Sequence, residues 1–360
     1  MSDPFRFISL LLLLPCVRMM KCKRNIPWQP AIYEHKAALI GRSPYEVSRS
    51  VKLLVEAMQR EFDVYGSNYM TVGLDVYNVE AEALGAKVIM PGRNACPDLE
   101  SALFDLNSLP GDFRHPEIPR AGRFELLLEA GRRIKEALGG QVRVRVAASG
   151  PVTLAVKLSS VEDVILSLCV EDGLALRVLN FAAEIAERWI RCLRDHNLEA
   201  IIFDSMAAPP MLSPTLYERY AMPMHQRLMR VLQASGQRER ELVIGGNTTP
   251  IAGLLAQTGA TILLCDYAAD ARAFKAALGD DHSCVIRRNL APTALGCADP
   301  IELVKQLAAD LALFSRPMAG TGVLPYDFDP ECLLTLRDLL AAHIQCQLAQ
   351  EDDRRPHSYM

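Results

Sequence analysis

The amino-acid sequence predicts an α/β fold, a single (β/α)8 TIM barrel with its active site at the C-terminal ends of the strands. Eight short apolar runs alternate with helical patterns along the 360 residues, which is typical of parallel β/α units. Runs such as Ile201–Asp204 and Ile262–Cys265 are apolar on both faces, as strands covered by helices require. Most runs end in polar residues, and in a barrel these ends converge on one mouth, where catalysis occurs.

The predicted strands are spread along most of the chain, and their number equals that of a closed barrel of this type. Residues 27–349 are therefore interpreted as one barrel domain, because α/β barrels commonly reach this size as a single unit. The eight strands are Trp28–Tyr33, Tyr69–Asp75, Val142–Ala148, Ala200–Asp204, Leu242–Gly246, Ile262–Cys265, Cys284–Arg288 and Pro317–Gly320.

Helical patterns fill the gaps between the strands. Glu46–Glu61 carries apolar residues at helical spacing, and Ser213 followed by Pro214 predicts the start of a helix capped by Ser213. The stretch from 90 to 119, rich in Pro, Gly and Asp, predicts a long loop after the second strand. The remaining predicted helices are Ala121–Leu138, Asp172–His196, Ser213–Leu232, Pro250–Gln257, Asp270–Leu278, Pro300–Phe314 and Glu331–Ala349.

Composition excludes some classes of function. The formal net charge is -4 at pH 7, and no basic stripe interleaved with aromatic residues is present, so no nucleic-acid partner is expected. The ten cysteines form no C-x-x-C pair. Scattered single cysteines favour reduced, buried thiols and hence a cytoplasmic protein over a disulfide framework.

Both ends of the chain differ from the barrel region. Residues 1–26 form an apolar leader, interpreted as a packed helix or a disordered segment, with a secretory signal as the alternative. Its apolar core, FISLLLLLPCVRMM, is interrupted by Pro15 and Arg18 and is too short to span a bilayer. No membrane partner is therefore expected. The tail from 350 to 360 is predicted to be disordered.

Polar residues at the strand ends are the candidates for the site. Each one alone is as well explained by a helix cap or a loop hydrogen bond, but seven such ends together indicate a common function at the mouth. The ends are Asp75, Ser149, Asp204–Ser205, Asn247–Thr248, Asp266, Arg287–Asn289 and Thr321.

An ordered set of segments resembles the uroporphyrinogen decarboxylase superfamily, which includes tetrapyrrole decarboxylases and corrinoid-linked methyltransferases. The resemblance covers roughly residues 28 to 345 and implies a (β/α)8 barrel, in agreement with the strand count. The segments are PAIYEHKAALIG (30–41), VGLDVYNVEAEALGAKV (72–88), ASGPVTLA (148–155), IIFDSMAA (201–208), IGGNTTPI (244–251), LLCDY (263–267), VIRRNLAP (285–292) and AGTGVLPYDFDPE (319–331).

The decarboxylase branch implies a catalytic role for Asp75. A fixed carboxylate there would accept pyrrole N–H groups and stabilise the cation formed when a ring carbon is protonated, and Asp204–Ser205 also resembles the decarboxylase segment. Two positions depart from this branch. The arginine-rich segment after the first strand is replaced by one that offers His35 and Lys36, and Thr321 replaces a histidine.

The methyltransferase branch implies a zinc site built from an H-x-C-G-N motif and a later cysteine, because zinc activates a thiol through N and S ligands. The corresponding positions here are Val243, Gly245 and Thr321. All three ligands are missing, so no metal is expected and no cofactor belongs to the chain itself.

Several other candidate residues can have either a functional or a structural role. One of Arg287 and Arg288 is expected to face the barrel interior, where it either binds a substrate carboxylate or forms a structural ion pair with Asp266 or Glu80. The remaining predicted site residues each have a structural alternative of packing or surface exposure: Tyr77 and His35 are proposed as catalytic, and Glu80, Asp204, Ser205, Asn247, Asp266, Thr321 and Tyr326 as substrate-binding.

Three functions follow from these observations. The first hypothesis is a decarboxylase-like lyase that acts without metal on a carboxylated small-molecule substrate, with a tetrapyrrole as one candidate. The second is a zinc-less methyltransferase that works with a corrinoid-carrying partner protein. The third is a non-catalytic tetrapyrrole-binding protein.

Overall fold

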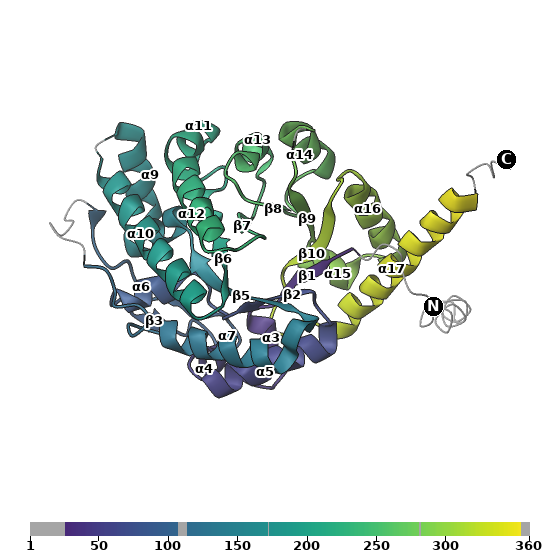
Figure 1. The fold of residues 1–360 in the computed structure, drawn as a ribbon, viewed down its shortest axis with the longest axis horizontal. Helices are drawn as coiled ribbons and strands as arrows, with labels where there is room; N and C mark the ends of the chain where they lie inside the picture. The colour runs from purple at the N-terminus through teal and green to yellow at the C-terminus, as the bar shows by residue number, and fades with distance from the viewer. Residues whose placement is uncertain (1–25, 107–113, 172, 281, 354–360) are drawn as a thin grey trace.

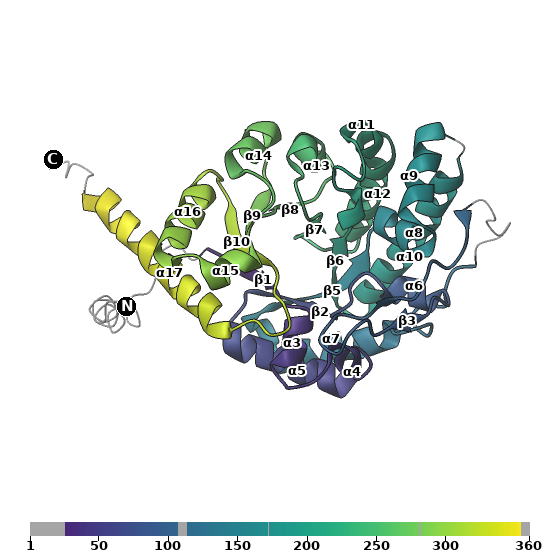
Figure 2. The same ribbon diagram turned by 180° about the vertical axis from the view of Figure 1, so that it is seen from behind.

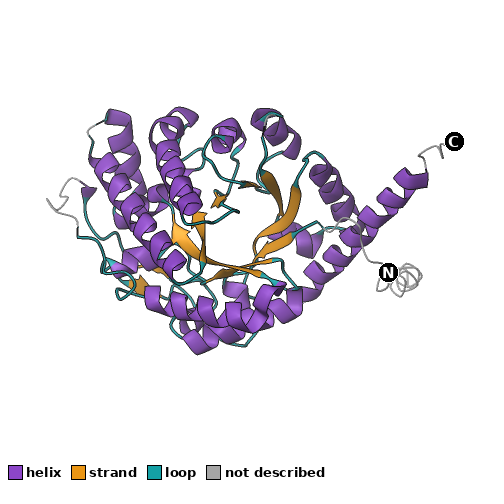
Figure 3. Cartoon of the chain, in the orientation of Figure 1, coloured by secondary structure: helices purple, strands orange, loops and turns teal. Residues whose placement is uncertain are grey.

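Eight parallel strands form a nearly closed barrel with helices around it (Figures 1 and 3). The structure is a computed structural model that describes residues 26–106, 114–171, 173–280 and 282–353. The barrel order is β1-β10-β9-β8-β7-β6-β5-β2, and all eight predicted strands are confirmed. Their bounds are β1 Trp28–Ala31, β2 Tyr69–Val72, β5 Arg143–Ser149, β6 Glu199–Phe203, β7 Glu241–Val243, β8 Ile262–Cys265, β9 Val285–Leu290 and β10 Pro317–Val323.

The first and second barrel strands close the cylinder through a single residue. Asn68, just before β2, donates its backbone N–H to the carbonyl of Trp28 at 3.0 Å. Its side-chain Oδ1 accepts the backbone N–H of Trp28 at 2.8 Å. The backbone and side chain of Asn68 thus take the place of the regular hydrogen bonds that β1 and β2 do not form with each other. They pair the backbone N–H and carbonyl of Trp28, which would otherwise be unpaired.

The helices surround the barrel on its outer side, and the last one extends beyond it (Figure 2). Most follow a barrel strand and return the chain to the start of the next. Their bounds are α3 Glu34–Ala38, α4 Pro44–Ser48, α5 Val51–Tyr65, α6 Val79–Ala83, α7 Phe124–Leu138, α8 Pro151–Leu158, α9 Val161–Val170, α10 Leu174–Asp195, α11 Pro214–Leu216, α12 Met222–Ala234, α13 Ala252–Ala256, α14 Ala271–Leu278, α15 Pro292–Cys297, α16 Pro300–Ala312 and α17 Pro330–Asp353.

Several helices differ from the predictions. The predicted helix Glu46–Glu61 is two helices, because Ser50 caps the start of α5 with its side chain. The predicted helix Ser213–Leu232 begins as expected, with Ser213 as the cap and Pro214 in the first turn. It then passes through a π-helical turn, Tyr217–Ala221, which ends two residues before Pro223, a residue that lacks the N–H of a regular helix.

Some elements were not predicted. Helices α3, α6, α8, α9 and α15 lie in segments without a predicted helix. Two short antiparallel strands, β3 Val88–Ile89 and β4 Asp98–Leu99, lie within or beside the long loop expected after β2. The predicted leader lies almost wholly outside the described residues, as does most of the predicted tail. No helix of the described ranges is long and apolar enough to cross a membrane.

The lower interior of the barrel is polar. Arg145 on β5 pairs with Glu241 on β7 at 2.5 Å, and Arg287 on β9 pairs with the other carboxylate oxygen of Glu241 at 3.0 Å. Gln29 on β1 donates to both oxygens of Glu241, at 3.4 and 3.3 Å. Charged side chains buried in this way must be paired and hydrogen-bonded. This ionic layer therefore contains two positively charged guanidinium groups, those of Arg145 and Arg287, and one negatively charged carboxylate, that of Glu241.

An apolar layer separates this ionic layer from the mouth. It contains inward-facing residues from four neighbouring strands together with Val76, against which Tyr33 and Tyr77 pack. The strand residues are Ala147, Ile201, Phe203, Val243 and Leu264. The site residues above therefore rest on a packed floor.

Candidate active site

A chain of polar contacts crosses the barrel mouth from β2 to β7. The hydroxyl of Tyr77, in the loop after β2, lies 2.9 Å from Oγ of Ser205, the second residue after β6. That same Oγ accepts the backbone N–H of Gly245, after β7, at 3.4 Å. Both predicted residues, Tyr77 and Ser205, are therefore brought together, and both are partly exposed to solvent.

The chain of contacts continues from β7 to β9 through Asp266. One carboxylate oxygen of Asp266 accepts the N–H of Gly246 at 2.8 Å, and the other accepts from Nδ2 of Asn289 at 3.2 Å. No cationic side chain is bonded to the Asp266 carboxylate within the described ranges. The other amide atom of Asn289, Oδ1, is buried without a hydrogen-bond partner among those residues. The carboxylate of Asp266 and the unpaired Oδ1 of Asn289 are therefore the two hydrogen-bond acceptors at this side of the mouth.

Three aromatic rings pack together beside the Tyr77–Ser205 contact. Phe203 lies edge-on to Tyr33 and to Tyr77, with ring centroids 6.1 and 6.0 Å apart. Burial raises the pKa of Tyr77, although the hydrogen bond with Ser205 and the charge of Arg287 lower it. Burial likewise raises the pKa of Tyr33. Both phenols therefore keep their protons at neutral pH and are available as hydrogen-bond donors.

The two arginines of β9 face opposite sides of the barrel wall, as alternation along a strand predicts. Arg287 faces the interior, where it contacts Glu241. Arg288 faces the helix layer and bonds Asp310 of α16 at 2.9 Å and the carbonyl of Asp266 at 2.6 Å. The structure therefore brings Arg287, and not Arg288, to the interior below the mouth.

Two glycines lie in this ring of residues, in different surroundings. A Cβ on Gly245 would lie 3.6 Å from both Asp266 and Ser205. A Cβ on Gly320, on β10, would lie 2.6 Å from Oδ1 of Asn289 and 3.3 Å from the Arg287 side chain. An added Cβ at Gly245 would thus make only ordinary contacts, whereas at Gly320 it would also lie 2.6 Å from the carbonyl oxygen of Gln29, so the close packing at β10 requires glycine.

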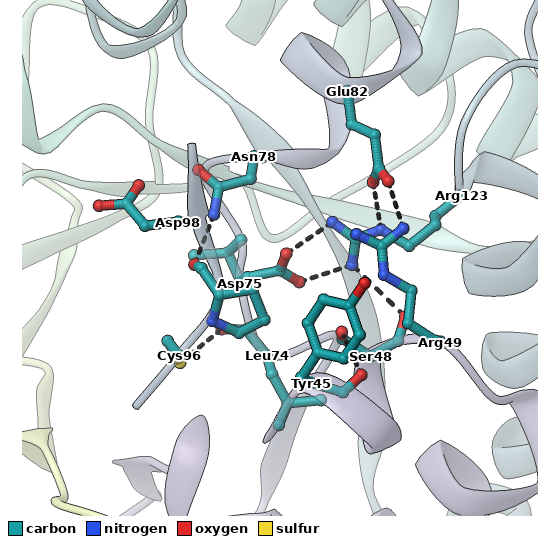
Figure 4. Close-up of polar contacts among 12 residues, drawn as sticks. Tyr45, Ser48, Arg49, Leu74, Asp75, Asn78, Glu82, Cys96, Asp98 and Arg123 are labelled. Atoms are coloured by element: carbon teal, nitrogen blue, oxygen red, sulfur yellow. Dashed lines mark hydrogen bonds and ion pairs between the residues drawn. The ribbon is translucent and has the colours of Figure 1, made fainter. Parts of the chain in front are cut away.

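Asp75 lies in a separate, buried ionic cluster (Figure 4). Arg123, at the start of α7, donates from Nη1 and Nη2 to the two oxygens of Asp75, at 2.7 and 2.5 Å. The same guanidinium bonds Glu82 at 2.5 Å, and Glu82 also contacts Arg49. Asp75 is 5% exposed, and both of its oxygens are held by a cation of this chain.

Asp204 is fully buried behind the mouth. Its oxygens accept the backbone N–H groups of Val152 and Thr153 at 3.2 and 2.6 Å, at the start of α8. His225 lies 2.8 Å away through Nε2, and its Nδ1 lies 3.0 Å from the hydroxyl of Tyr217. These contacts direct the carboxylate of Asp204 to the N-terminus of a helix.

The structure directs the other predicted residues away from the mouth contacts. Oγ1 of Thr321 accepts the N–H of Ala31 at 3.1 Å. Thr321 is in register with Leu290, which packs in the outer apolar cluster. Its side chain therefore lies on the helix side of the wall.

Glu80 and Asn247 also make local contacts. Glu80 is buried and accepts from the backbone N–H and hydroxyl of Ser149 at 2.8 and 2.7 Å; burial raises the pKa of its carboxyl. Asn247 is exposed and accepts the N–H of Thr249 at 3.2 Å, closing a turn.

His35 is enclosed below α17. Its ring nitrogens lie 2.6 Å from the hydroxyl of Tyr65 and 3.0 Å from the carbonyl of Tyr326, and burial lowers its pKa. The Tyr326 hydroxyl donates to the carbonyl of Arg42 at 2.9 Å. Both side chains thus tie the loop after β10 to the segments that follow β1.

Some residues of the mouth and of the clusters below it had no sequence signal. Tyr33 was predicted only as the end of a strand, and Arg123 and Glu241 were not predicted as functional or structural partners. The strand β1 ends at Ala31 and its register shifts between Gln29 and Ala31, so alternation along the strand does not indicate the direction of Tyr33. Arg123 is 48 residues from Asp75, and no local pattern connects them.

The residues at the expected zinc position do not fit the metal. Val243 packs in the apolar layer, Gly245 has no side chain, and Thr321 lies on the helix side of the wall. The described ranges contain no group of three or more His, Cys, Asp or Glu side chains that could hold a metal ion. Zinc needs about four such ligands, or three with a water, so no step is assigned to it.

Comparisons with known proteins agree with this architecture. The chain is 26% identical over 161 residues to the methylcobamide:CoM methyltransferase MtaA of Methanosarcina barkeri, covering 43% of this chain and 47% of that protein. It is 24% identical over 207 residues to the methylcobamide:CoM methyltransferase MtbA of Methanosarcina mazei, covering 56% and 57%. The chain thus spans about half the length of the curated relatives it matches.

A solved structure has the same fold. The structure of a methyltransferase from Methanosarcina mazei superposes with a TM-score of 0.76 at 19% identity, covering 93% of this chain and 98% of that one. The family model of uroporphyrinogen decarboxylase (URO-D) matches residues 19–318. The chain therefore belongs to the uroporphyrinogen decarboxylase family.

Proposed function

We propose that this chain is a methyltransferase that moves a methyl group from a small O- or N-methyl donor to a corrinoid carried by a partner protein, without zinc. The named relatives, which are methylcobamide:CoM methyltransferases, support the reaction class. The chain's own cofactor requirement is none, because the corrinoid enters as a methyl acceptor on the partner.

The observation that carries the proposal is the contact between Tyr77 and Ser205 at the mouth. Cleaving a carbon–oxygen or carbon–nitrogen bond leaves an electron pair on the heteroatom, and a positioned acid lowers the barrier by protonating it. A reduced corrinoid on the partner would supply the electron pair for the new bond to the methyl carbon, the bond from the methyl carbon to the heteroatom would break, and the heteroatom would keep that electron pair and take the proton of Tyr77. Water then reprotonates the phenolate. Burial keeps Tyr77 protonated for this step.

The rest of the mouth orients the donor molecule. Asp266, which has no bonded cation within the described ranges, and Oδ1 of Asn289 accept hydrogen bonds, while the rings of Tyr33 and Phe203 supply apolar surface. Fixing the donor in this way converts a bimolecular encounter into an oriented reaction.

The decarboxylase hypothesis has less support. It requires the carboxylate of Asp75 to accept pyrrole N–H groups, but both oxygens of Asp75 are engaged by Arg123. A carboxylate held in a bidentate ion pair is a weak acceptor for a further ligand. We therefore place the reaction at Tyr77 and Ser205.

The test is methyl transfer to reduced free cobalamin, followed by the absorbance change on methylation, with a panel of O-methyl and N-methyl donors. Uroporphyrinogen is assayed in parallel for release of carbon dioxide. Transfer from at least one donor supports the proposal. Turnover of uroporphyrinogen without methyl transfer overturns it in favour of the decarboxylase, and tight porphyrin binding without either reaction favours a binding protein.

A further inference from the structure

Thr153, in the first turn of α8, holds the chain on both sides of Ser205. Its backbone N–H donates to Oδ1 of Asp204 at 2.6 Å, and its Oγ1 accepts the backbone N–H of Met206 at 3.1 Å. Asp204 and Met206 are the residues directly before and after Ser205. Thr153 is 2% exposed, and burial strengthens hydrogen bonds of this kind. One residue of α8 thus fixes the segment from which Ser205 projects.

The start of α8 explains why Asp204 is part of this arrangement. The first N–H groups of a helix need acceptors, which are usually supplied by the side chain of the N-cap residue. The N-cap residue of α8 is Gly150, which has no side chain, and Asp204 accepts the N–H groups of Val152 and Thr153 instead. A Cβ on Gly150 would lie 2.2 Å from Cβ of Asp204. The end of β6 and the start of α8 are therefore in direct contact.

His225 holds the Asp204 carboxylate from the other side. Nε2 of His225 lies 2.8 Å from Oδ2 of Asp204, and Nδ1 lies 3.0 Å from the hydroxyl of Tyr217. Burial raises the pKa of Tyr217, so its hydroxyl keeps the proton that it donates to Nδ1, and Nε2 then carries the hydrogen that faces Asp204. All three side chains are fully buried. The position of Asp204 is thus set by two separate helices, α8 and α12.

Both chain neighbours of Asp204 contact Tyr77. Oγ of Ser205 lies 2.9 Å from the Tyr77 hydroxyl, and the ring of Phe203 lies edge-on to that of Tyr77 with centroids 6.0 Å apart. A shift of Asp204 would therefore move the two side chains that hold the phenol. Such shifts matter for a rate, because a misplacement of about 1 Å can lower it by about 100-fold.

We propose that Thr153 is a positioning residue, which keeps Oγ of Ser205 within hydrogen-bonding distance of the Tyr77 hydroxyl, and that His225 supports it by holding Asp204. Thr153 acts through the backbone of residues 204–206. Its effect on the rate rests on the proposed function, in which Tyr77 is the acid. Its effect on the contact between Tyr77 and Ser205 does not depend on that function.

Matched variants separate positioning from stability. Thr153→Val removes the hydroxyl with little change in shape and keeps the backbone N–H, whereas Thr153→Ser keeps the hydroxyl. Thr258 provides the control, because it is also 2% exposed and its Oγ1 also accepts a backbone N–H, that of Ala260, at 3.3 Å. Thr258→Val should therefore lose a similar amount of stability without an effect on Tyr77.

Nuclear magnetic resonance of the full chain, labelled with 13C at Cζ of tyrosine, reports the contact without turnover. The Tyr77 signal is identified by its loss in Tyr77→Phe, and Ser205→Ala gives its position without the hydrogen bond. We expect Thr153→Val to move the signal toward the Ser205→Ala position, and Thr153→Ser and Thr258→Val to leave it in place. An unmoved signal in Thr153→Val, or an equal movement in Thr258→Val, would overturn the proposal.

The rate of methyl transfer provides the second measurement. We expect Thr153→Val to lower kcat by about tenfold with little change in KM, because the acid is misplaced while the donor still binds, and Thr153→Ser to restore most of the rate. A loss confined to KM would contradict a positioning role. A Tyr77 signal that moves as expected in a protein without methyl transfer would refute the proposed function and leave this inference intact.

Discussion

Arg123 donates hydrogen bonds to both carboxylate oxygens of Asp75, at 2.7 and 2.5 Å, although the two residues are 48 positions apart in the chain. The pair joins the loop after β2 to the start of α7, and Glu82 adds a second anion to the same guanidinium. Because the pair is almost fully buried, each partner depends on the other. Removing either partner is therefore expected to destabilise the fold.

Asp75→Asn is expected to lower the free energy of unfolding by about 3 kcal/mol, since it leaves most of the Arg123 charge buried without its main partner. Arg123→Gln should have a similar effect. The exposed pair of Lys87 and Glu100 provides the control, and Lys87→Gln should change stability by less than about 0.5 kcal/mol. Urea unfolding measures all three. An Asp75→Asn protein with normal stability but no turnover would instead indicate a role in the reaction.

Tyr77→Phe is expected to lower the rate of methyl transfer by about 100-fold or more, the usual contribution of a positioned acid, with little change in the melting temperature. The wild-type rate should stay constant up to about pH 10, because burial raises the pKa of Tyr77 above the ordinary tyrosine value of about 10 and the acid form persists. Above the raised pKa the rate should fall. A rate that declines between pH 7 and 9, or a Tyr77→Phe protein of unchanged rate, would show that another group supplies the proton.

The sequence predicts the barrel wall well because local rules govern it. Apolar runs located all eight strands, and alternation along β9 correctly separated Arg287 from Arg288. Ser205 and Asp266 were grouped because they follow strands whose ends converge, whereas Tyr77 was a separate candidate.

The partners of these residues could not be predicted in the same way. Asp204 also follows a strand, yet its carboxylate turns to the N-terminus of α8, a helix that had not been predicted. Thr321 was also chosen as a strand-end residue. Its position along β10, in register with Leu290, instead directs its side chain to the outer, helix-covered side of the barrel. The side-chain direction of a strand-end residue depends on register and on neighbouring helices, which a single sequence does not contain.

Alkaline pH is expected to destabilise the fold. Burial raises the pKa of Tyr33, Tyr65, Tyr77 and Tyr217, and raises that of Tyr69 to about 12. A pKa raised by folding means that the folded state holds the proton more tightly than the unfolded chain. The stabilisation is complete below the unfolded pKa of about 10 and is lost as the pH rises through the folded values.

Unfolding by urea between pH 8 and 12, with absorbance at 295 nm to follow tyrosine ionisation, measures this effect. Tyr69→Phe keeps the ring against Arg145 and removes the hydroxyl, so its free energy of unfolding should fall less steeply above pH 10 than that of the wild type. Stability that rises over this range would contradict the assignment of buried, neutral tyrosines.

Gly150→Ala is expected to destabilise the protein by about 3 kcal/mol or more, because overpacking a rigid site forces its neighbours to move. A Cβ at residue 150 would lie 2.2 Å from Cβ of Asp204, and Asp204 cannot retreat since the N–H groups of α8 and His225 hold its carboxylate. Gly140→Ala is the matched control, since its added methyl group enters open space and should change stability by less than about 0.5 kcal/mol. Thermal and urea unfolding compare the two. Equal stability of both variants would mean that Asp204 moves freely, and that the cap it forms on α8 does not hold the end of β6 in place.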